Sequence, residues 1–302
     1  MFRGLSAFPL TPLRDDQLDE DALARLVGRL AAADVDSITV LGSTGVYPYL
    51  ARDERRRAIE VAVEHAAGTP VLAGIGALRT SQVVALGQDA LAAGASGVLL
   101  APVSYHRLSD DEVFGLYRDV TGALAAPLVV YDNPGTTHVE FSEELHARIA
   151  ALPHVASVKL PGIADPAAAQ ARVRRLRALV PASVTIGVSG DGGAATGLLA
   201  GSDIWYSSLG GVIPGPIAAI ARAALAGDGV RARAWSDRLQ GLWDLLGPYG
   251  GVRVSAAIAE ELGVVGPDCL PRPLLGLPPD ARAGLRAVLQ GLSSRSGPDV
   301  LG

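Results

Sequence analysis

The pattern that decides the fold lies in residues 128–160, LVVYDNPGTTHVEFSEELHARIAALPHVASVKL. An apolar run at 128–131 is followed by a stretch at 142–151 in which apolar residues recur at steps of three and four, and then by a second apolar run at 155–160. Short apolar runs are typical of strands buried on both faces, and the periodicity between them is that of an amphipathic helix. The segment therefore predicts a strand, a helix and a second strand parallel to the first.

The same alternation continues in both directions from this segment. We expect strands at residues 4–8, 37–41, 71–75, 97–101, 128–131, 155–160, 184–188 and 204–207. We expect helices at residues 21–33, 52–67, 81–93, 110–124, 142–151, 166–179 and 194–200. This α/β pattern predicts a (β/α)8 TIM barrel as the catalytic domain, residues 1–228. An open doubly wound sheet is the alternative, because strand order is not visible in the sequence, but no GxGxxG turn follows the first strand.

The alternation stops near residue 230. Helical periodicity continues at residues 231–246, 252–262 and 279–292, with no apolar run of the strand type between these stretches. We therefore expect a helical C-terminal extension over residues 229–292. Residues 293–302 are rich in Ser, Gly and Pro, which predicts a disordered tail.

Composition restricts the classes of protein to which the chain can belong. The 302 residues carry a net charge of −5, which favours neither nucleic acid nor an anionic membrane surface as a partner. The single cysteine, Cys269, excludes an intramolecular disulfide framework, and none of the five histidines forms an HxxxH pair. The longest apolar runs fall far short of the ~20 residues of a membrane span. We expect a soluble, cytoplasmic protein without a metal or an organic cofactor.

One amine stands out among the basic residues. Of the 26 lysines and arginines, 25 are arginine, and Lys159 in the sixth expected strand is the only lysine. Burial in an apolar strand lowers the pKa of an amine from about 10.4 toward ~7–8, where the neutral form can attack a carbonyl and form a Schiff base. Arginine cannot do this, because its guanidinium stays protonated. The alternative interpretation is a lysine that reaches solvent from the strand end.

Three other strand ends carry polar groups where a barrel places its active site. Tyr131 ends the fifth strand one repeat before Lys159, so the two side chains should lie side by side; a core tyrosine is the alternative. Gly42-Ser43-Thr44-Gly45 follows the second strand and offers hydroxyl and N–H groups to a carboxylate, although such turns are common in loops. In Ser189-Gly190-Asp191 after the seventh strand, we interpret Asp191 as a helix cap and residues 187–190 as backbone that lines the site.

These motifs, in this order, resemble the dihydrodipicolinate synthase and N-acetylneuraminate lyase family, from Ala7-Phe-Pro-Leu-Thr-Pro12 to the helical C-terminus. The resemblance implies a (β/α)8 barrel, a homotetramer or homodimer, and Schiff-base chemistry on pyruvate or another 2-oxo acid together with an aldehyde. It implies that Lys159 forms the Schiff base, that Tyr131 transfers protons, and that Thr44 or Ser43 joins this proton transfer. The substrate-binding residues that we expect are Ser43, Thr44, Gly45, Ser104, Tyr105, Thr136, Gly187, Ser189 and Tyr206.

The chain departs from the family pattern in ways that bear on the substrate. Thr136 stands where the synthases have an arginine for the carboxylate of aspartate semialdehyde, and Val46 stands where a glutamate is common. Ser104 takes the place of a tyrosine that reaches into the neighbouring subunit, with Tyr105 one position further on. Loss of a bidentate arginine removes the most specific recognition of a carboxylate.

The leading hypothesis is therefore a class I lyase or aldolase that cleaves or forms a C3–C4 bond of a 2-oxo acid through a lysine-bound enamine. Three alternatives stay open. They are dihydrodipicolinate synthase itself, a dehydratase of 2-keto-3-deoxy sugar acids, and a non-catalytic protein that binds a 2-oxo acid.

Overall fold

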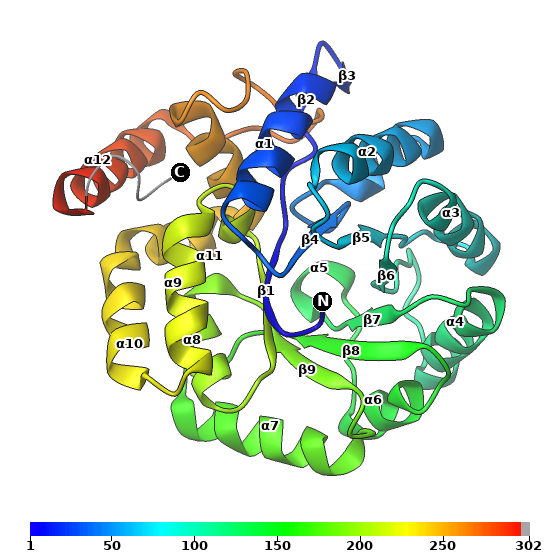
Figure 1. The fold of residues 1–302 in the computed structure, drawn as a ribbon. Helices are drawn as coiled ribbons and strands as arrows, with labels where there is room; N and C mark the ends of the chain where they lie inside the picture. Colours follow the sequence, from blue (N-terminus) through cyan, green and yellow to red (C-terminus); the bar gives the residue numbers. More distant parts are fainter. Residues whose placement is uncertain (297–302) are drawn as a thin grey trace.

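The chain forms a closed barrel of eight parallel strands, which confirms the predicted fold class (Figure 1). This computed structural model describes the backbone of residues 1–296 and the side chains of residues 1–292. Each barrel strand pairs with the next one along the chain, and the barrel closes where the last strand, β10, pairs with β1. The strands are β1 (Gly4–Ala7), β4 (Ser37–Val40), β5 (Val71–Gly74), β6 (Gly97–Leu100), β7 (Leu128–Tyr131), β8 (Val155–Leu160), β9 (Thr185–Val188) and β10 (Ile204–Ser207).

Helices surround the barrel on the outside (Figure 1). Side chains in the preceding loops fix several of their starts: Asp19, Ser109, Ser142 and Asp165 each accept a hydrogen bond from the first turn of the helix that follows. The barrel helices are α1 (Glu20–Ala32), α2 (Arg52–His65), α3 (Thr80–Ala92), α4 (Asp110–Ala123), α6 (Glu143–Ala150), α7 (Pro166–Leu179), α8 (Ala194–Leu199) and α9 (Pro214–Leu225).

Short elements lie in the loops between strands and helices. An antiparallel pair of two-residue strands, which the sequence did not lead us to expect, follows β1; its turn residues Asp15 and Asp16 have positive φ. The short elements are β2 (Leu13–Arg14), β3 (Gln17–Leu18), η1 (Tyr47–Tyr49), α5 (Pro134–Thr137), η2 (Asp191–Gly193) and η3 (Leu209–Gly211).

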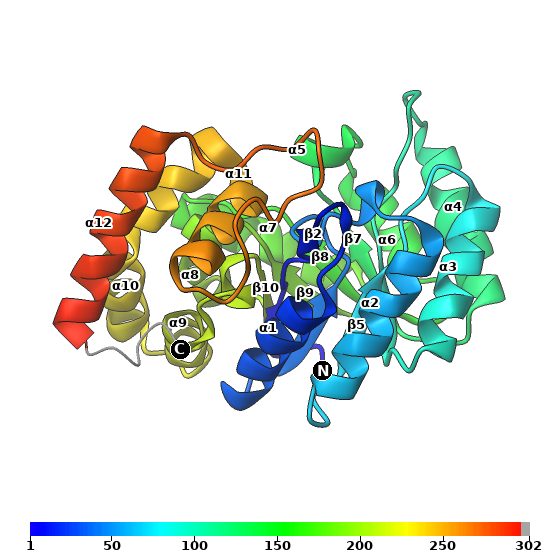
Figure 2. The same cartoon turned by 90° about the horizontal axis from the view of Figure 1, so that it is seen from above.

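The C-terminal helices gather on one side of the molecule, away from α3 and α4 (Figure 2). They are α10 (Gly229–Arg238), α11 (Gln240–Glu261) and α12 (Pro279–Ser296). The helix expected at 231–246 is in fact divided at Leu239, and the indole N–H of Trp243 donates to the carbonyl oxygen of Ser236 across this break. The boundary expected near residue 250 is present as a kink in α11 at Gly250, where φ is 75°.

The end of the chain differs from the expected tail. Helix α12 continues to Ser296, so residues 293–296 are helical where the sequence predicted disorder. The rest of the expected tail, residues 297–302, lies outside the described residues. Among the helices that the structure describes, none is long and apolar enough to cross a membrane.

Two sets of apolar side chains form the core. The larger set packs between the sheet and the surrounding helices. The smaller set fills the barrel, and three of its eight members are aromatic: Phe8, Tyr131 and Tyr206. Parallel strands in a barrel point alternate side chains inward, so residues paired in register share one level of the interior. In this register, Tyr131 pairs with Lys159, and Lys159 pairs with Gly187.

Candidate active site

A cavity of about 580 Å³ opens at the carboxyl ends of the strands, with Lys159 in its wall. We call it the Lys159 cavity. The loops after β4, β7, β9 and β10 supply polar residues, and the kinked region of α11 closes one side with Leu246, Gly250 and Val252. The site therefore combines strand ends that are far apart in sequence with the C-terminal extension.

Lys159 is a buried amine without an acidic partner. Its side chain lies near the end of β8, and the residue is 3% exposed. Burial lowers its pKa to about 7, and the negative charge of Asp191 opposes this change in part. Within residues 1–292, no hydrogen bond or ion pair satisfies Nζ. The neutral, nucleophilic form of this amine is therefore well populated near neutral pH.

Three aromatic rings lie close to the amine. Nζ lies 3.8 Å from the ring centroid of Tyr131, 3.9 Å from that of Phe8 and 5.8 Å from that of Tyr206. The hydroxyl of Tyr206 points away and donates to Ser157 Oγ at 2.7 Å, so Tyr206 offers its ring to the cavity rather than a polar group.

The Tyr131 hydroxyl lies in a network of polar side chains. Asn133 Nδ2 donates to it at 2.8 Å, and Ser43 Oγ lies 3.3 Å away. The same Asn133 amide also donates to Thr136 Oγ1 at 3.0 Å. Burial raises the pKa of Tyr131, whereas the hydrogen bonds from Ser43 and Asn133 lower it by stabilising the phenolate. This phenol can give a proton away and then hold the negative charge that remains.

The turn after β4 presents a second polar group to the cavity. Thr44 Oγ1 is hydrogen-bonded to Ser208 Oγ at 2.8 Å, and Ser208 in turn lies 3.3 Å from Ser255 Oγ. The sequence left open whether Thr44 or Ser43 joins the proton transfer, and the structure places Ser43, not Thr44, beside Tyr131. Among the residues that the structure describes, none accepts a hydrogen bond from the backbone N–H groups of Ser43 and Thr44. Two such donors beside a hydroxyl suit a carboxylate.

Asp191 has a different position from the one that the sequence predicted. We expected a helix cap, but its carboxylate accepts from Trp205 Nε1 at 3.0 Å and from the backbone N–H of Leu209 at 2.7 Å. The residue is buried and lines the Lys159 cavity. These two donors come from β10 and η3, so the side chain turns inward instead of back onto its own loop.

The sequence profile of the dihydrodipicolinate synthetase family matches residues 1–292. The chain belongs to the dihydrodipicolinate synthetase family. It is 34% identical over 241 residues to the 4-hydroxy-tetrahydrodipicolinate synthase of Phenylobacterium zucineum, covering 79% of this chain and 80% of that one. It is 30% identical over 297 residues to that of Gluconacetobacter diazotrophicus, covering 96% of this chain and 97% of that one.

A solved structure of a dihydrodipicolinate synthase from Agrobacterium tumefaciens is also similar. The two chains share 44% identity with a TM-score of 0.93, over 97% of this chain and 98% of that one. Membership in the dihydrodipicolinate synthetase family confirms the enzyme class expected from the sequence, a class I, pyruvate-dependent lyase or aldolase.

The structure brings most of the predicted site residues of this family member together. The residues that line one cavity are Ser43, Thr44, Tyr131, Thr136, Lys159, Ser189 and Tyr206. Val46, where the resemblance led us to expect a glutamate, also lines this cavity and gives it an apolar patch.

Four predicted binding residues lie elsewhere. Gly45 belongs to the tight turn, where an added Cβ would lie 2.8 Å from the backbone N of Leu41. Gly187 packs under the Tyr206 ring instead of facing the cavity. Ser104 and Tyr105 are in the loop after β6, which projects from the barrel end (Figure 2). Tyr105 is 90% exposed there, and Ser104 Oγ accepts from the backbone N–H of His106.

Sequence reasoning missed Phe8, Asn133 and Ser208 as members of the site. Each directly follows a strand or lies within two residues of its end, and this position was the available signal. Phe8 was not singled out because an aromatic residue at a strand end is usually core.

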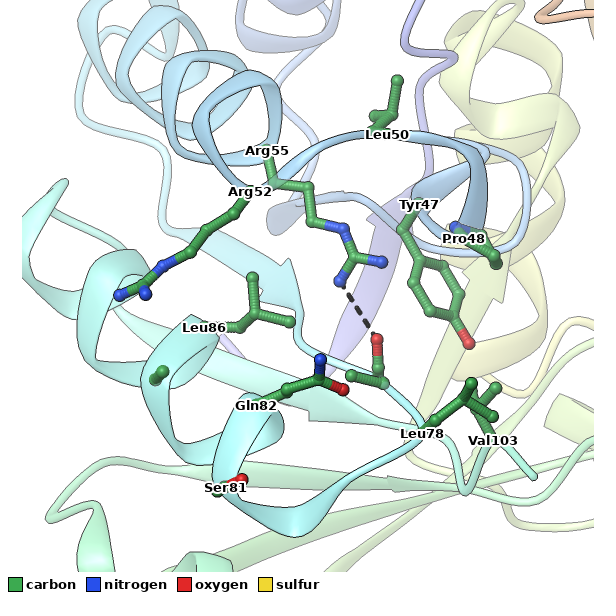
Figure 3. A pocket seen from close by; sticks show the side chains of 13 residues that line it. Tyr47, Pro48, Leu50, Arg52, Arg55, Leu78, Ser81, Gln82, Leu86 and Val103 are labelled. Atoms are coloured by element: carbon green, nitrogen blue, oxygen red, sulfur yellow. Dashed lines mark hydrogen bonds between the residues drawn. The ribbon is translucent and has the colours of Figure 1, made fainter. Parts of the chain in front are cut away.

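A second cavity of about 560 Å³ adjoins the first (Figure 3). Tyr47 and Pro48 line both cavities and form the wall between them. Its two arginines are already engaged: Arg55 donates to the Gly76 carbonyl oxygen, as the dashed line in Figure 3 marks, and Arg52 pairs with Asp89. The buried amine lies in the Lys159 cavity, so we place the chemistry there.

Proposed function

We propose that this member of the dihydrodipicolinate synthetase family forms a Schiff base between Lys159 and C2 of pyruvate or a related 2-oxo acid, and makes or cleaves the C3–C4 bond through the enamine. The observation that carries the proposal is the buried, unpaired amine of Lys159 beside the hydrogen-bonded phenol of Tyr131. Because its pKa is about 7, a large fraction of this amine is neutral at neutral pH, which is the requirement for attack on a carbonyl.

The proposed reaction needs one nucleophile and one proton carrier. Neutral Nζ attacks C2, and the former carbonyl oxygen becomes a hydroxyl group. Tyr131 donates its proton to that hydroxyl, so water leaves and a protonated imine forms. In the cleavage direction, the Tyr131 phenolate takes the proton of the C4 hydroxyl while the C3–C4 electron pair moves into the imine, which releases an aldehyde and leaves an enamine. Protonation of the enamine at C3 and hydrolysis restore free Lys159.

The substrate carboxylate has a suitable position in the Lys159 cavity. The N–H groups of Ser43 and Thr44 and the Thr44 hydroxyl would hold it. The same arrangement leaves the Ser43 hydroxyl free to pass protons to and from Tyr131.

We further propose that the aldehyde partner is uncharged, either hydroxylated or aromatic. Among the described residues that line the cavity, Lys159 is the only basic side chain, and Thr136 offers a hydroxyl where a guanidinium would pair with a second carboxylate. Leu246, Val252 and Leu274 add apolar surface to the cavity.

Borohydride reduction in the presence of pyruvate tests the proposal. We expect one covalent adduct by intact mass, mapped to Lys159 by peptide analysis. Because the chain has a single lysine, the N-terminal amine is the only other primary amine, and the map distinguishes the two. The variant Lys159→Arg keeps the charge and should give no adduct at this position. An unmodified Lys159 peptide from the wild-type protein at saturating pyruvate would refute the proposal.

Dihydrodipicolinate synthesis is the second candidate, because the relatives named above carry that activity in their names. Turnover of pyruvate with aspartate semialdehyde, compared with an uncharged hydroxyaldehyde and an aromatic aldehyde, separates the two. Faster turnover of the semialdehyde would favour dihydrodipicolinate synthesis over a reaction with an uncharged aldehyde. A 2-keto-3-deoxy sugar acid in the same assay distinguishes loss of water from C3–C4 cleavage and so tests the dehydratase alternative.

The proposal includes a homotetramer or homodimer that works in the cytoplasm. Leu78 and Tyr105 support the assembly, because they are 66% and 90% exposed on loops after the neighbouring strands β5 and β6. The single, buried Cys269 is compatible with a reducing compartment. Light scattering after gel filtration gives the oligomeric state, and a monomer at micromolar concentration would contradict the assembly.

A further inference from the structure

The environment of the Lys159 amine is aromatic on two sides. Tyr131 and Phe8 place ring centroids 3.8 Å and 3.9 Å from Nζ, within the distance at which a cation is attracted to the face of a ring. In the proposed reaction, the hydroxyl of Tyr131 transfers protons. Phe8 has no polar atom and is 2% exposed, so its contact with the reacting nitrogen is its only approach to the chemistry.

The fold holds the Phe8 ring in place. The backbone N–H of Phe8 donates to the Ser207 carbonyl oxygen at 2.9 Å, which ties the residue to the end of β10. Its ring lies over Gly42, where a Cβ would be 2.5 Å from Cδ1, and packs edge-to-face against Tyr206 with centroids 6.0 Å apart. The ring therefore cannot swing away from Nζ without disturbing β10 and the turn after β4.

The proposed reaction changes the charge at this nitrogen. The amine that attacks is neutral, whereas the imine that follows must carry a positive charge to act as an electron sink. A ring face attracts the cation and hardly interacts with the neutral amine, so it favours the intermediate over the free enzyme. Differential binding of this kind accelerates a reaction. In a site that excludes water, the attraction is stronger than at a surface.

We propose that Phe8 is a catalytic residue whose ring face stabilises the cationic imine at Lys159 Nζ. The inference rests on the proposed Schiff-base function and adds a residue to it. It also explains how a buried cation can form at a nitrogen for which the structure records no hydrogen-bond acceptor within residues 1–292.

A series of fluorinated phenylalanines at position 8 tests the proposal. Analogues that carry one, two and three ring fluorines progressively remove the negative potential of the ring face and nearly keep its shape. We expect the equilibrium constant for imine formation with pyruvate, measured by borohydride trapping against pyruvate concentration, to fall stepwise to a total of about 10- to 30-fold. The pH midpoint of trapping should also move to lower pH along the series, because the ring stabilises the ammonium form as well.

The matched control is the same series at Phe141, which stacks on His146 and does not line the Lys159 cavity. It should leave the trapping equilibrium unchanged. Phe8→Leu, which keeps an apolar side chain without a ring, should resemble the most fluorinated analogue. Equal equilibrium constants across the position-8 series, with wild-type protein forming the adduct, would refute the role of Phe8 alone. No adduct in the wild-type protein would refute the Schiff-base function itself.

Discussion

Replacement of Lys159 by methionine should make the protein more stable, and more so at low pH. The ordinary pKa of lysine is 10.5, and burial lowers it to about 7 in the folded protein. Between these pH values the unfolded chain binds the additional proton, so the free energy of unfolding rises with pH through this window and is lowest below it. At about 1.4 kcal/mol per tenfold change in the proton equilibrium, the buried amine costs roughly 4–5 kcal/mol at pH 7 and below.

Lys159→Met fills similar space without a titratable group and removes this cost. We expect the variant to exceed the wild type in free energy of unfolding by several kcal/mol at pH 6–7. The difference in free energy of unfolding should shrink as the pH rises from about 7 and become constant above about pH 10.5, where the amine is neutral in the folded and the unfolded protein alike. Urea titrations of both proteins at a series of pH values measure it.

A surface variant is the control for this experiment. Arg107→Met removes a cation from an exposed loop position, and its difference from the wild type should be small and independent of pH over the same range. A stability difference for Lys159→Met that stays constant between pH 6 and 10.5 would show that the amine has an ordinary pKa in the folded state. The argument for a neutral nucleophile would then fail.

Three further variants test individual parts of the site. Tyr131→Phe removes the proton carrier, so kcat should fall by about 10²- to 10⁴-fold in steady-state assays while borohydride still traps an adduct more slowly; near-normal turnover would contradict the assignment. Asp191→Asn removes the negative charge that raises the pKa of Lys159, so the pH midpoint of trapping should move to lower pH, and an unchanged midpoint would argue against this coupling. Gly187→Ala places a Cβ 2.3 Å from Cε2 of the Tyr206 ring, and overpacking there should lower the free energy of unfolding by about 1–3 kcal/mol in denaturant titrations; a fully stable variant would mean that the ring can move.

The fold could be predicted from the sequence because a buried parallel strand and an amphipathic helix each leave a local pattern. The repeat over residues 128–160 contains both, and the register of Tyr131 with Lys159 followed from the length of one strand-helix-strand repeat. The division of the first C-terminal helix at Leu239 could not be predicted, because helical periodicity continues through it. The short β2–β3 pair was missed because strands of two residues are too short to show a periodic pattern.

The site was predicted in part. Lys159 and Tyr131 were found because scarcity and position at strand ends are visible in one dimension. The choice between Ser43 and Thr44 was not, because adjacent residues of a turn point in different directions and only the folded turn shows which hydroxyl meets Tyr131. Asp191 was misinterpreted because a local cap and a long-range acceptor for Trp205 have the same sequence signature.

The sequence by itself determined the eightfold alternation, the enzyme class through its family motifs, and the single lysine that we propose forms the Schiff base. The tertiary structure alone decided the surroundings of that amine: the faces of Phe8 and Tyr131, the carboxylate of Asp191, and the wall contributed by the kink at Gly250. The physical reason is that the pKa of a buried group, and the charge that it can carry during a reaction, depend on burial and on neighbours that come from distant segments of the chain.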